Sequence, residues 1–492
     1  MVRIGRYRVG AAALALAFVL PGLALAQDRG VASGKIPVTT TSEDALKLYL
    51  EGRSLQDVIR GTDARKYYEE AVARDPNFAM AYLALANTAP SPKEFFENLN
   101  KAVALVEHAS EGERGMIWAL DAGVKGKPEM QKEHLTKLVG GFPSDERVHT
   151  ALANFHFGRQ EYGAAINHYG HAVKINPEFS PPYNSMGYAH RSLGQYEEAE
   201  QAFLEYIELI PDQPNPHDSY AELLMKMGRF EESIAAYEKA LSLDEHFVFS
   251  FVGIANNQIF LGEPEMARET LYKMSVSARN TGERRTALVW TAASYVHEGY
   301  TKKAVESVER MYAIAEENGD DVAMAGDLIL MGTILLEADQ PDAAAEKYER
   351  AVYVMNQADA PDEVKEATRR NQLYRDARVA LRKHDLDTAR EKTTAYGEQV
   401  KTHMIRFEER RVRELLGAIA LGEDDFAGAR EHLAHANQQN PRILFMMAMA
   451  YHGLGDAQHE KMMLEKAGNF NGLNFNYAYV RPKAQKIMKA ES

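Results

Sequence analysis

The sequence predicts an all-α protein, a solenoid of antiparallel helical hairpins, and three observations support this fold class. First, the stretch from Glu146 to Thr281 aligns with itself at a step of 34 residues without gaps. Second, small residues recur in two aligned columns, which read Ala153, Gly187, Ala221, Ala255 and Ala165, Ala199, Ser233, Ala267. Third, aromatic residues and prolines recur in step with them, as in Tyr162, Tyr196, Phe230 and Pro177, Pro211. A fixed period of this length is typical of repeat proteins.

One copy of the repeat explains the columns. Apolar residues recur at helical spacing before Gly194, which permits a turn, and again from Tyr196 until Pro211 ends the second helix. Gly187 and Ala199 are expected where the two helices approach most closely. Each helix of about 12 to 14 residues is too short to be stable alone, so neighbouring hairpins must cover it. This pattern resembles the tetratricopeptide repeat, and the resemblance implies a right-handed superhelical solenoid.

The pattern extends in both directions, so about twelve hairpins are expected. Helical periodicity begins at Glu43, and residues 43–281 are predicted to form an N-terminal repeat array. Residues 282–405 keep helical periodicity with looser spacing and are expected to be a degenerate helical-repeat region. The columns return in residues 406–470, a predicted C-terminal pair of repeats. Residues 471–492, which combine asparagines and aromatics with a basic end, are expected to cap the stack.

The first 26 residues have the three-part layout of a secretory signal peptide. Three arginines precede an apolar run from Val9 to Leu20, and Ala24-Leu25-Ala26 supplies the small residues of a cleavage site. A membrane anchor is the weaker interpretation, because the run is short and Pro21 interrupts it. We therefore expect cleavage after Ala26, a flexible linker over residues 27–42, and a mature chain that is periplasmic in a bacterium or secreted.

Composition excludes several classes of function. The chain has 492 residues and no cysteine, which excludes disulfides, thiol chemistry and a lipid-modified cysteine. Without the three signal-peptide arginines, 54 basic residues (57 less three) stand against 71 acidic ones, a formal charge of −17. Such a charge disfavours nucleic acid as a partner. No later apolar run is long enough to span a bilayer, so no membrane span is expected after cleavage.

One block differs from the acidic remainder of the chain. Residues 361–413 contain 14 Lys and Arg against 10 Asp and Glu, a local excess of four positive charges. The simpler interpretation is a solvated helix surface, and the alternative is a dedicated surface for an acidic partner.

No catalytic motif is present, and two groups of metal-binding residue types need to be weighed. His168 with His171, and His432 with His435, are each three residues apart and could share a helix face, but zinc needs further ligands. Thioethers and imidazoles could bind cuprous copper near the C-terminus, where the sequence clusters Met446, Met447, Met449, Met462, Met463, His452 and His459. The simpler interpretation is that these methionines fill a hydrophobic core, so no metal site is assigned.

The resemblance to tetratricopeptide repeats implies a peptide-binding groove lined by the first helices of successive repeats. Transferred by position, the groove residues are Asn154, Phe157, Asn184, Tyr188, Arg191, Asp218, Glu222, Asn256 and Phe260. Asparagine can pair with both the N–H and the C=O of an extended peptide, so this strip would hold a peptide without reading its sequence. The alternative is that these positions are merely solvated. The strip lacks the lysines with which some family members bind a C-terminal carboxylate, which disfavours chaperone-tail binding.

These observations predict an exported scaffold or adaptor that binds a protein or peptide partner, with no cofactor and no catalysis of its own. The alternatives are an accessory subunit or carrier with a copper or small-molecule site, and an enzyme whose site lies in the degenerate middle region. Neither the partner nor the oligomeric state follows from the sequence.

Overall fold

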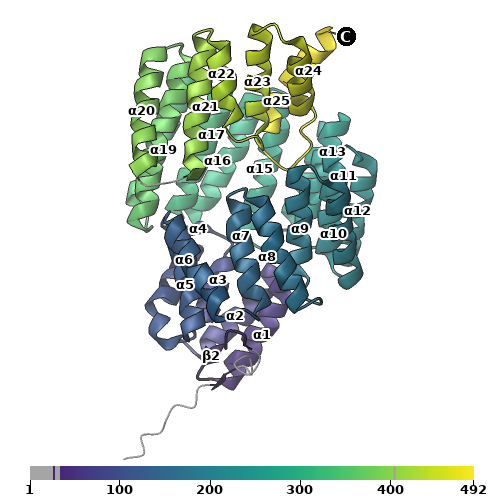
Figure 1. The fold of residues 1–492 in the computed structure, drawn as a ribbon, viewed down its shortest axis with the longest axis vertical. Helices are drawn as coiled ribbons and strands as arrows, with labels where there is room; N and C mark the ends of the chain where they lie inside the picture. The colour runs from purple at the N-terminus through teal and green to yellow at the C-terminus, as the bar shows by residue number, and fades with distance from the viewer. Residues whose placement is uncertain (1–25, 28–33, 403–405, 492) are drawn as a thin grey trace, which may run out of the picture.

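The computed structural model describes residues 26–27, 34–402 and 406–491, and this part of the chain is almost entirely helical (Figure 1). Successive helices pack side by side as twelve antiparallel hairpins, followed by a final helix α25. The predicted solenoid of about twelve hairpins is therefore confirmed. The predicted signal peptide lies outside the described residues except for Ala26.

Hairpins 1–7 are built from helices of nine to fifteen residues. They pair α1 Glu43–Asp57 with α2 Gly61–Arg74, α3 Ala79–Asn87 with α4 Pro92–Ala104, α5 Glu111–Val124 with α6 Pro128–Gly141, α7 Glu146–Gly158 with α8 Tyr162–Ile175, α9 Pro181–Leu193 with α10 Tyr196–Leu209, α11 Pro214–Lys226 with α12 Phe230–Leu243, and α13 Phe249–Leu261 with α14 Pro264–Ser277. A short 3-10 helix, η2 Val106–His108, links α4 to α5.

Hairpins 8–12 begin with longer helices. They pair α15 Thr281–His297 with α16 Thr301–Glu317, α17 Asp321–Glu337 with α18 Pro341–Gln357, α19 Asp362–Arg382 with α20 Leu386–Thr402, α21 Arg406–Gly422 with α22 Phe426–Ala434, and α23 Pro441–Gly453 with α24 Ala457–Gly468, before α25 Tyr477–Glu491. Because α15 to α18 have 17 residues each, about one turn more than earlier helices, the 34-residue step is lost there.

One close contact sets the geometry of hairpins on both sides of this change. A first-helix glycine faces the side chain 16 residues later in the pairs Gly52/Tyr68, Gly187/Phe203, Gly332/Tyr348 and Gly417/Leu433. A Cβ atom at Gly187 would lie 2.6 Å from the Phe203 ring, so the helix crossing expected at Gly187 is present. Gly332 shows the same contact in hairpin 9, so the hairpin geometry persists where the sequence step does not.

Local signals explain where the helices begin and end. Ser110 caps α5 and forms a capping box with Glu113, and Asp145 caps α7 by accepting from the N–H of Arg147. Gly194 and Gly262 end α9 and α13 with φ of 75° and 88°, a left-handed conformation that costs glycine little.

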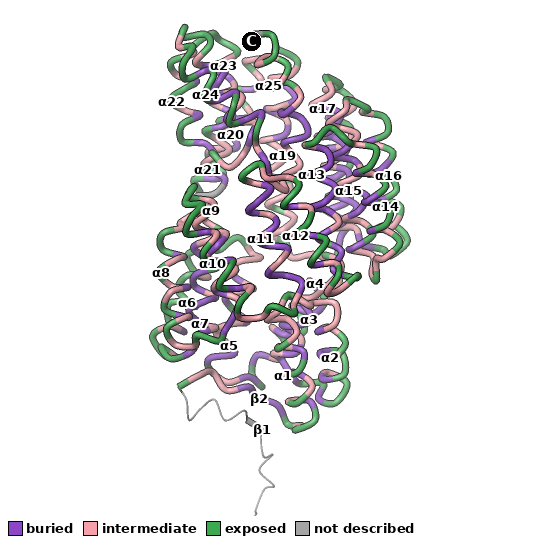
Figure 2. The backbone as a smooth tube through the Cα atoms, turned by 90° about the vertical axis from the view of Figure 1, so that its right-hand side faces the viewer, coloured by how far each residue is buried: buried purple, intermediate pink, exposed green. Residues whose placement is uncertain are grey.

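The hairpins wind into a superhelix whose successive turns touch (Figures 1 and 2). Each of hairpins 1 to 4 contacts the hairpin seven places further along. The contacts are Thr62 with Glu283 for hairpins 1 and 8, Lys93 with Asp320 for 2 and 9, Lys127 with Glu363 for 3 and 10, and Gln160 with Arg410 for 4 and 11. These contacts are hydrogen bonds and ion pairs. In the described part of the chain, no buried hydrophobic cluster joins hairpins 1–4 to hairpins 8–11.

Residues 34–42, which were expected to be part of a flexible linker over 27–42, form a strap that is hydrogen-bonded to the hairpins. Backbone N–H groups of the strap donate to side-chain carboxylates, Ile36 to Asp145 at 2.9 Å and Thr39 to Glu113 at 2.8 Å. Val38 is buried against α1 and α2. A two-residue strand in the strap, β2 Thr39–Thr40, pairs antiparallel with β1 Ala26–Gln27. The strap has no apolar periodicity, and hydrogen bonds to side-chain acceptors on three hairpins hold it in place instead.

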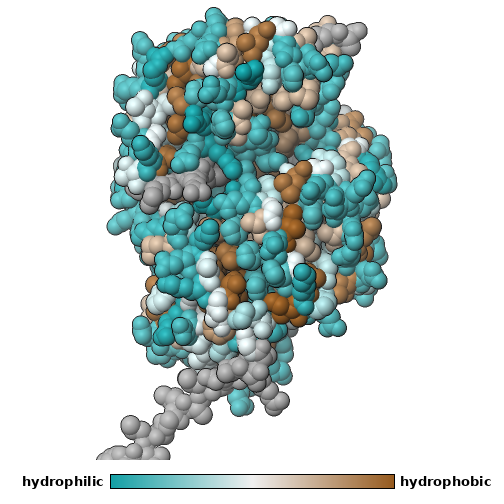
Figure 3. Space-filling model, in the orientation of Figure 1, coloured by the Kyte–Doolittle hydropathy of each residue, from teal (hydrophilic) through white to brown (hydrophobic). Residues whose placement is uncertain are grey.

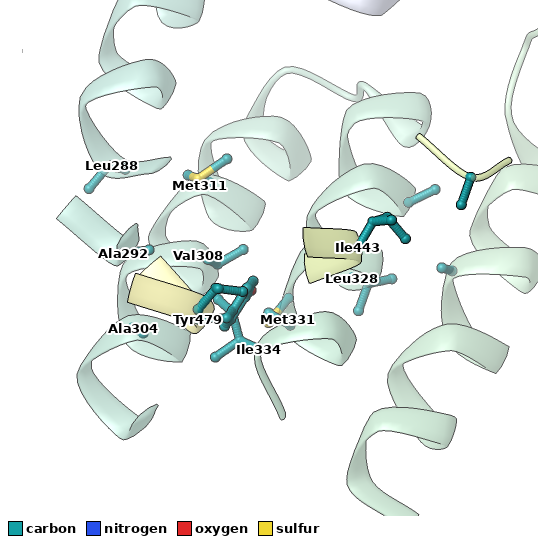
Figure 4. Packing of buried hydrophobic residues seen from close by; sticks show 14 of the residues in the cluster. Leu288, Ala292, Ala304, Val308, Met311, Leu328, Met331, Ile334, Ile443 and Tyr479 are labelled. Carbon is teal, nitrogen blue, oxygen red and sulfur yellow. The ribbon is translucent and has the colours of Figure 1, made fainter. Parts of the chain in front are cut away.

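The hydrophobic core runs between the helices along the stack, and the C-terminal residues complete it. Tyr479 of α25 lies against Val308 of α16 and Ile334 of α17 in the largest buried cluster (Figure 4). The face seen in Figure 3 is mostly hydrophilic, with hydrophobic side chains confined to narrow bands. The C-terminal residues therefore do cover apolar surface, although they lie across the inside of the superhelix and not only at its end.

Candidate functional site on the inner surface

The first helices of hairpins 1–4 enclose a cavity of about 750 Å³, here called the N-terminal cavity. Its walls come mainly from α1, α3, α5 and α7, with Tyr68 of α2 and Phe179 beside them, and Lys35 to Val38 of the strap line one side. Aromatic, aliphatic, amide and charged side chains all line it. A cavity of this size and mixture suits a ligand that is partly apolar and carries several hydrogen-bonding groups.

Three amides in the N-terminal cavity offer such groups. Gln56 and Asn154 each accept a tyrosine hydroxyl through the side-chain oxygen, from Tyr68 and Tyr169 respectively, both at 2.6 Å. This arrangement fixes the amide plane and turns the NH₂ group away from the tyrosine. Asn87, on α3, is exposed to the same cavity. The cavity therefore presents oriented amide donors to a bound molecule.

A bidentate ion pair forms the charged part of the cavity wall. The Arg147 guanidinium binds the Asp57 carboxylate at 2.7 and 2.6 Å and lies over the Phe179 ring at 4.7 Å. Burial disfavours the charged form of Arg147, but the hydrogen bonds and charge of Asp57 outweigh it and raise the pKa of Arg147. The pair joins hairpin 1 to hairpin 4, so it fixes the width of the cavity.

Asn154 lines the cavity, and the other predicted groove residues lie further along the inner surface. Tyr188 donates to Glu222 at 2.9 Å, Arg191 binds the other oxygen of Glu222 at 2.7 Å, and the guanidinium lies 4.7 Å from the Tyr188 ring centroid. Asn184 donates to Asn215 at 3.2 Å. Phe157 is half-buried against Tyr162. The structure therefore joins Tyr188, Arg191 and Glu222 in one hydrogen-bonded group, and Asn184 makes a separate hydrogen bond to Asn215.

Asp218 and Asn256 are buried in the same region. Asp218 accepts from the Ser250 hydroxyl at 2.6 Å, and burial raises its pKa to about 7. Asn256 is fully buried and donates to the Val252 carbonyl. Neither side chain is available to a ligand in this conformation. Next to them, Phe260 contacts the chain's own C-terminal residues Tyr477 and Arg481.

The histidine and methionine groups are not arranged as metal sites. His168 and His171 lie near His149 with ring centroids 6.0 and 5.6 Å away, while His432 faces Arg413. Met447 and Met463 are part of the hydrophobic core, and Met446 and Met449 pack against it. His452 and His459 are bonded to Glu460 and Asp456. Among the described residues, no group of three or more His, Asp or Glu side chains is placed to hold a metal ion.

Much of the basic block in residues 361–413 is paired within the protein. Arg370 forms a buried bidentate pair with Glu408, and Arg378 and Arg382 bind Glu337. Burial alone would raise the pKa of Glu337, but the cations around it, Arg442 and Arg378 foremost, lower it to about 2. These arginines therefore stabilise the packing of α17, α19 and α21.

Of the residues that line the N-terminal cavity, the sequence predicted only Asn154 as a binding residue. Asn87 could have been found by extending the repeat register backwards, because it directly follows the small residue Ala86, as Asn154 follows Ala153. The same register places Arg53 after Gly52. By contrast, no sequence signal pairs Asp57 with Arg147, since these residues are 90 positions apart.

Comparison with known proteins settles the nature of the repeats. Three family models described as tetratricopeptide repeat match residues 49–89, 180–213 and 214–247, which are hairpins 1–2, 5 and 6. The chain is a tetratricopeptide repeat protein. Repeats of this family support a role as a protein-interaction scaffold.

Two curated relatives share these repeats. The tetratricopeptide repeat protein is 27% identical over 107 residues to small glutamine-rich tetratricopeptide repeat-containing protein 2 of Mycosarcoma maydis, covering 21% of this chain and 30% of that protein. It is 27% identical over 174 residues to TPR repeat-containing protein YpiA of Bacillus subtilis (strain 168), covering 35% of this chain and 40% of YpiA. The match thus spans less than half the length of either relative.

Among solved structures, a tetratricopeptide repeat protein from Parabacteroides merdae ATCC 43184 is 15% identical, with 57% of this chain and 98% of that chain covered and a TM-score of 0.36. In the described part of this chain, no helix combines the length and the apolar composition needed to cross a membrane.

Proposed function

We propose that this tetratricopeptide repeat protein is an exported scaffold of the bacterial envelope, which binds a protein or peptide partner on its inner surface and has no catalysis of its own. The observation that carries the proposal is the N-terminal cavity, a space of about 750 Å³ whose walls combine aromatic side chains with oriented amides. An extended peptide has alternating N–H and C=O groups that such amides can bind, and side chains that the apolar wall can cover.

Export is supported by Arg3 to Arg8, the apolar run that follows and Ala24-Leu25-Ala26. When the gene is expressed with its own leader in a Gram-negative host, N-terminal sequencing of the periplasmic fraction should give a chain that starts at Gln27. A chain that keeps Met1 and stays in the membrane fraction would refute this part of the proposal.

Partner binding is tested with variants that change only the N-terminal cavity. The full chain is isolated from the envelope by an affinity tag after mild crosslinking, and bound proteins are identified and quantified by mass spectrometry. Two substitutions act on the cavity: Asn87→Ala removes an amide, and Ala151→Trp fills the space. Each substitution should reduce the amount of the specific partner that is recovered at least about tenfold, because central contacts in a buried pocket carry most of the binding energy.

Matched controls lie on the second helix of hairpin 4. Asn167→Ala and Ala164→Trp make the same changes at exposed positions of α8 and should leave the partner and the melting temperature unchanged. Equal loss of the partner in the cavity and control variants would show that binding does not use the cavity. Turnover of a substrate by the pure chain would contradict the absence of catalysis.

A further inference from the structure

The C-terminal residues 469–481 cross the inner surface of hairpins 6 and 7, where a bound peptide was expected. Residues 470–476 are in no helix, and α25 begins at Tyr477. The Phe470 ring lies 4.1 Å from Nζ of Lys226, at the end of α11. The Tyr477 ring packs edge-on against Phe260 of α13 at 4.9 Å. We call residues 469–481 the C-terminal segment.

The C-terminal segment uses the groove as a ligand would. Phe260 is one of the predicted groove residues, and both its contacts in this segment are aromatic or cationic: Tyr477, and the Arg481 guanidinium 4.4 Å from the ring centroid. Tyr477 and Ala478 join the buried cluster formed by Val252, Ala255 and Ile259 of α13. The same surface thus holds aromatic side chains and one cation from a single stretch of chain, and Asn471 of that stretch accepts a hydrogen bond from the cation.

The docked segment leaves several polar groups without good partners. Among the described residues, the buried hydroxyls of Tyr477 and Tyr479 have no hydrogen-bond partner. Arg481 is 5% exposed and donates to Asn471 at 2.8 Å, and no carboxylate of the described residues pairs with it. Its burial lowers its pKa to about 10. Burying these hydroxyls and this cation without full hydrogen bonding costs free energy, which weakens the docked state relative to its apolar contacts.

We propose that the C-terminal segment is a built-in ligand of the groove, which a partner displaces by presenting an extended segment of the same chemistry, aromatic and asparagine residues followed by a cation. This inference rests on the proposed function in assigning the inner surface to peptide binding. It adds the chemistry of the bound peptide and a competition between the chain and its partner. The apparent affinity for a partner is then the intrinsic affinity multiplied by the fraction of molecules whose groove is free.

The test measures binding in trans to the full-length protein. The probe is a fluorescent synthetic peptide of residues 469–491, and binding is followed by anisotropy. Loosening the chain's own segment with Phe470→Ala and Leu473→Ala, both half-buried positions, should raise the affinity for the probe at least about tenfold, because the groove is free more often. Adding Phe260→Ala should abolish the gain, since it removes a groove contact of the probe.

Two controls separate this effect from general loosening. Tyr451→Ala removes a half-buried aromatic residue of α23 that stacks on His459, and should leave the affinity at the wild-type value. A probe in which the residues at positions 470 and 477 are alanine should not bind any variant. If the loosened variant keeps its melting temperature and still binds the probe no better than wild type does, the inference is wrong.

A second measurement needs no substitution. In the wild-type chain, amides of residues 470–476 should exchange with deuterium at least about tenfold faster than those of α11 and α13, because undocking is a local opening. Exchange as slow as in those helices would make the segment part of the permanent core and overturn the inference. Either failure leaves the N-terminal cavity intact as a partner site, because the Asn87 and Ala151 variants test it separately.

Discussion

At Gly187, the absence of a side chain sets the distance between α9 and α10. The Phe203 ring fills the space where a Cβ atom would stand, 2.6 Å away, and Phe203 itself is fully buried. A larger residue must push the ring or the helix aside, because packed interiors have little free space. Gly187→Leu should therefore lower the free energy of unfolding by roughly 1 to 3 kcal/mol in urea denaturation.

The control for this prediction is Gly170→Leu in α8, where nothing lies within 4 Å of an added Cβ atom. Leucine is the better helix former, so Gly170→Leu should be neutral or stabilising by up to about 1 kcal/mol. Equal stability of the Gly187 and Gly170 variants would show that α9 and α10 do not cross closely at Gly187.

Asp218 makes stability depend on pH. Burial raises its pKa from about 3.8 to about 7, and Glu222 acts in the same direction, while the hydrogen bond from Ser250 opposes it. A carboxyl group with a raised folded-state pKa contributes stability at low pH, and this contribution is lost as pH rises through the folded-state value. Wild type should lose stability relative to Asp218→Asn between about pH 4 and pH 7. Thermal melts of both proteins across this range measure the difference, and parallel curves would contradict a buried neutral Asp218.

Single-residue predictions from sequence succeeded where the repeat dictates the environment. Gly187 belongs to a column that must be small, so its helix crossing could be predicted from the sequence. The groove residues follow a weaker rule, because the repeat register gives the side of the helix but not what lies opposite. Nothing in the sequence around Asn256 shows that it is fully buried, or that Glu222 binds Tyr188 and Arg191.

At the scale of elements, the hairpins could be predicted from the periodicity of the sequence, whereas the strap could not. Residues 34–42 have no apolar period and read as a linker, yet carboxylates of three hairpins bind them. Asp75, at the end of α2, receives hydrogen bonds from the Thr40 hydroxyl at 2.5 Å and from the Thr41 N–H at 2.8 Å. Hydrogen bonds to buried acceptors thus hold in place a segment that has no apolar period.

Asp75→Ala should release the end of the strap. It should lower the free energy of unfolding by roughly 1 to 3 kcal/mol and speed deuterium exchange in residues 38–41. Asp244 holds the same position after α12 and accepts from the His246 N–H, as Asp75 accepts from that of Asn77, but it binds no strap. Asp244→Ala is therefore the matched control, and exchange in residues 38–41 that is equally slow in both variants would contradict the strap's dependence on Asp75.

At the scale of the whole molecule, the superhelix is closed by contacts that no sequence pattern predicts. Arg279 binds Asp63 at 3.3 Å across 216 residues, and Lys127 binds Glu363 at 3.2 Å across 236. A cavity of about 640 Å³ lies beside the second pair, between the α5–α6 turn and the start of α19. Periodicity reports only contacts between neighbouring repeats, so the solenoid could be predicted while its closure could not.

Because the contacts between turns are polar, and those of Lys127 with Glu363 and Arg279 with Asp63 are exposed, the closure should respond to charge. Exposed ion pairs contribute little each and are screened by salt. The double variant Arg279→Glu, Lys127→Glu places like charges opposite Asp63 and Glu363. Its radius of gyration in small-angle X-ray scattering should exceed that of wild type at 0.1 M salt, because the turns separate while each hairpin keeps its neighbours. Raising the salt to 1 M should also increase the radius of gyration of wild type.

The control Lys137→Glu, Lys302→Glu makes the same charge change where each lysine pairs with a glutamate of its own helix, so its radius of gyration should equal that of wild type. If the two double variants have the same radius of gyration, the hydrophobic contacts of the C-terminal segment and α25 hold the superhelix closed without the polar contacts between its turns.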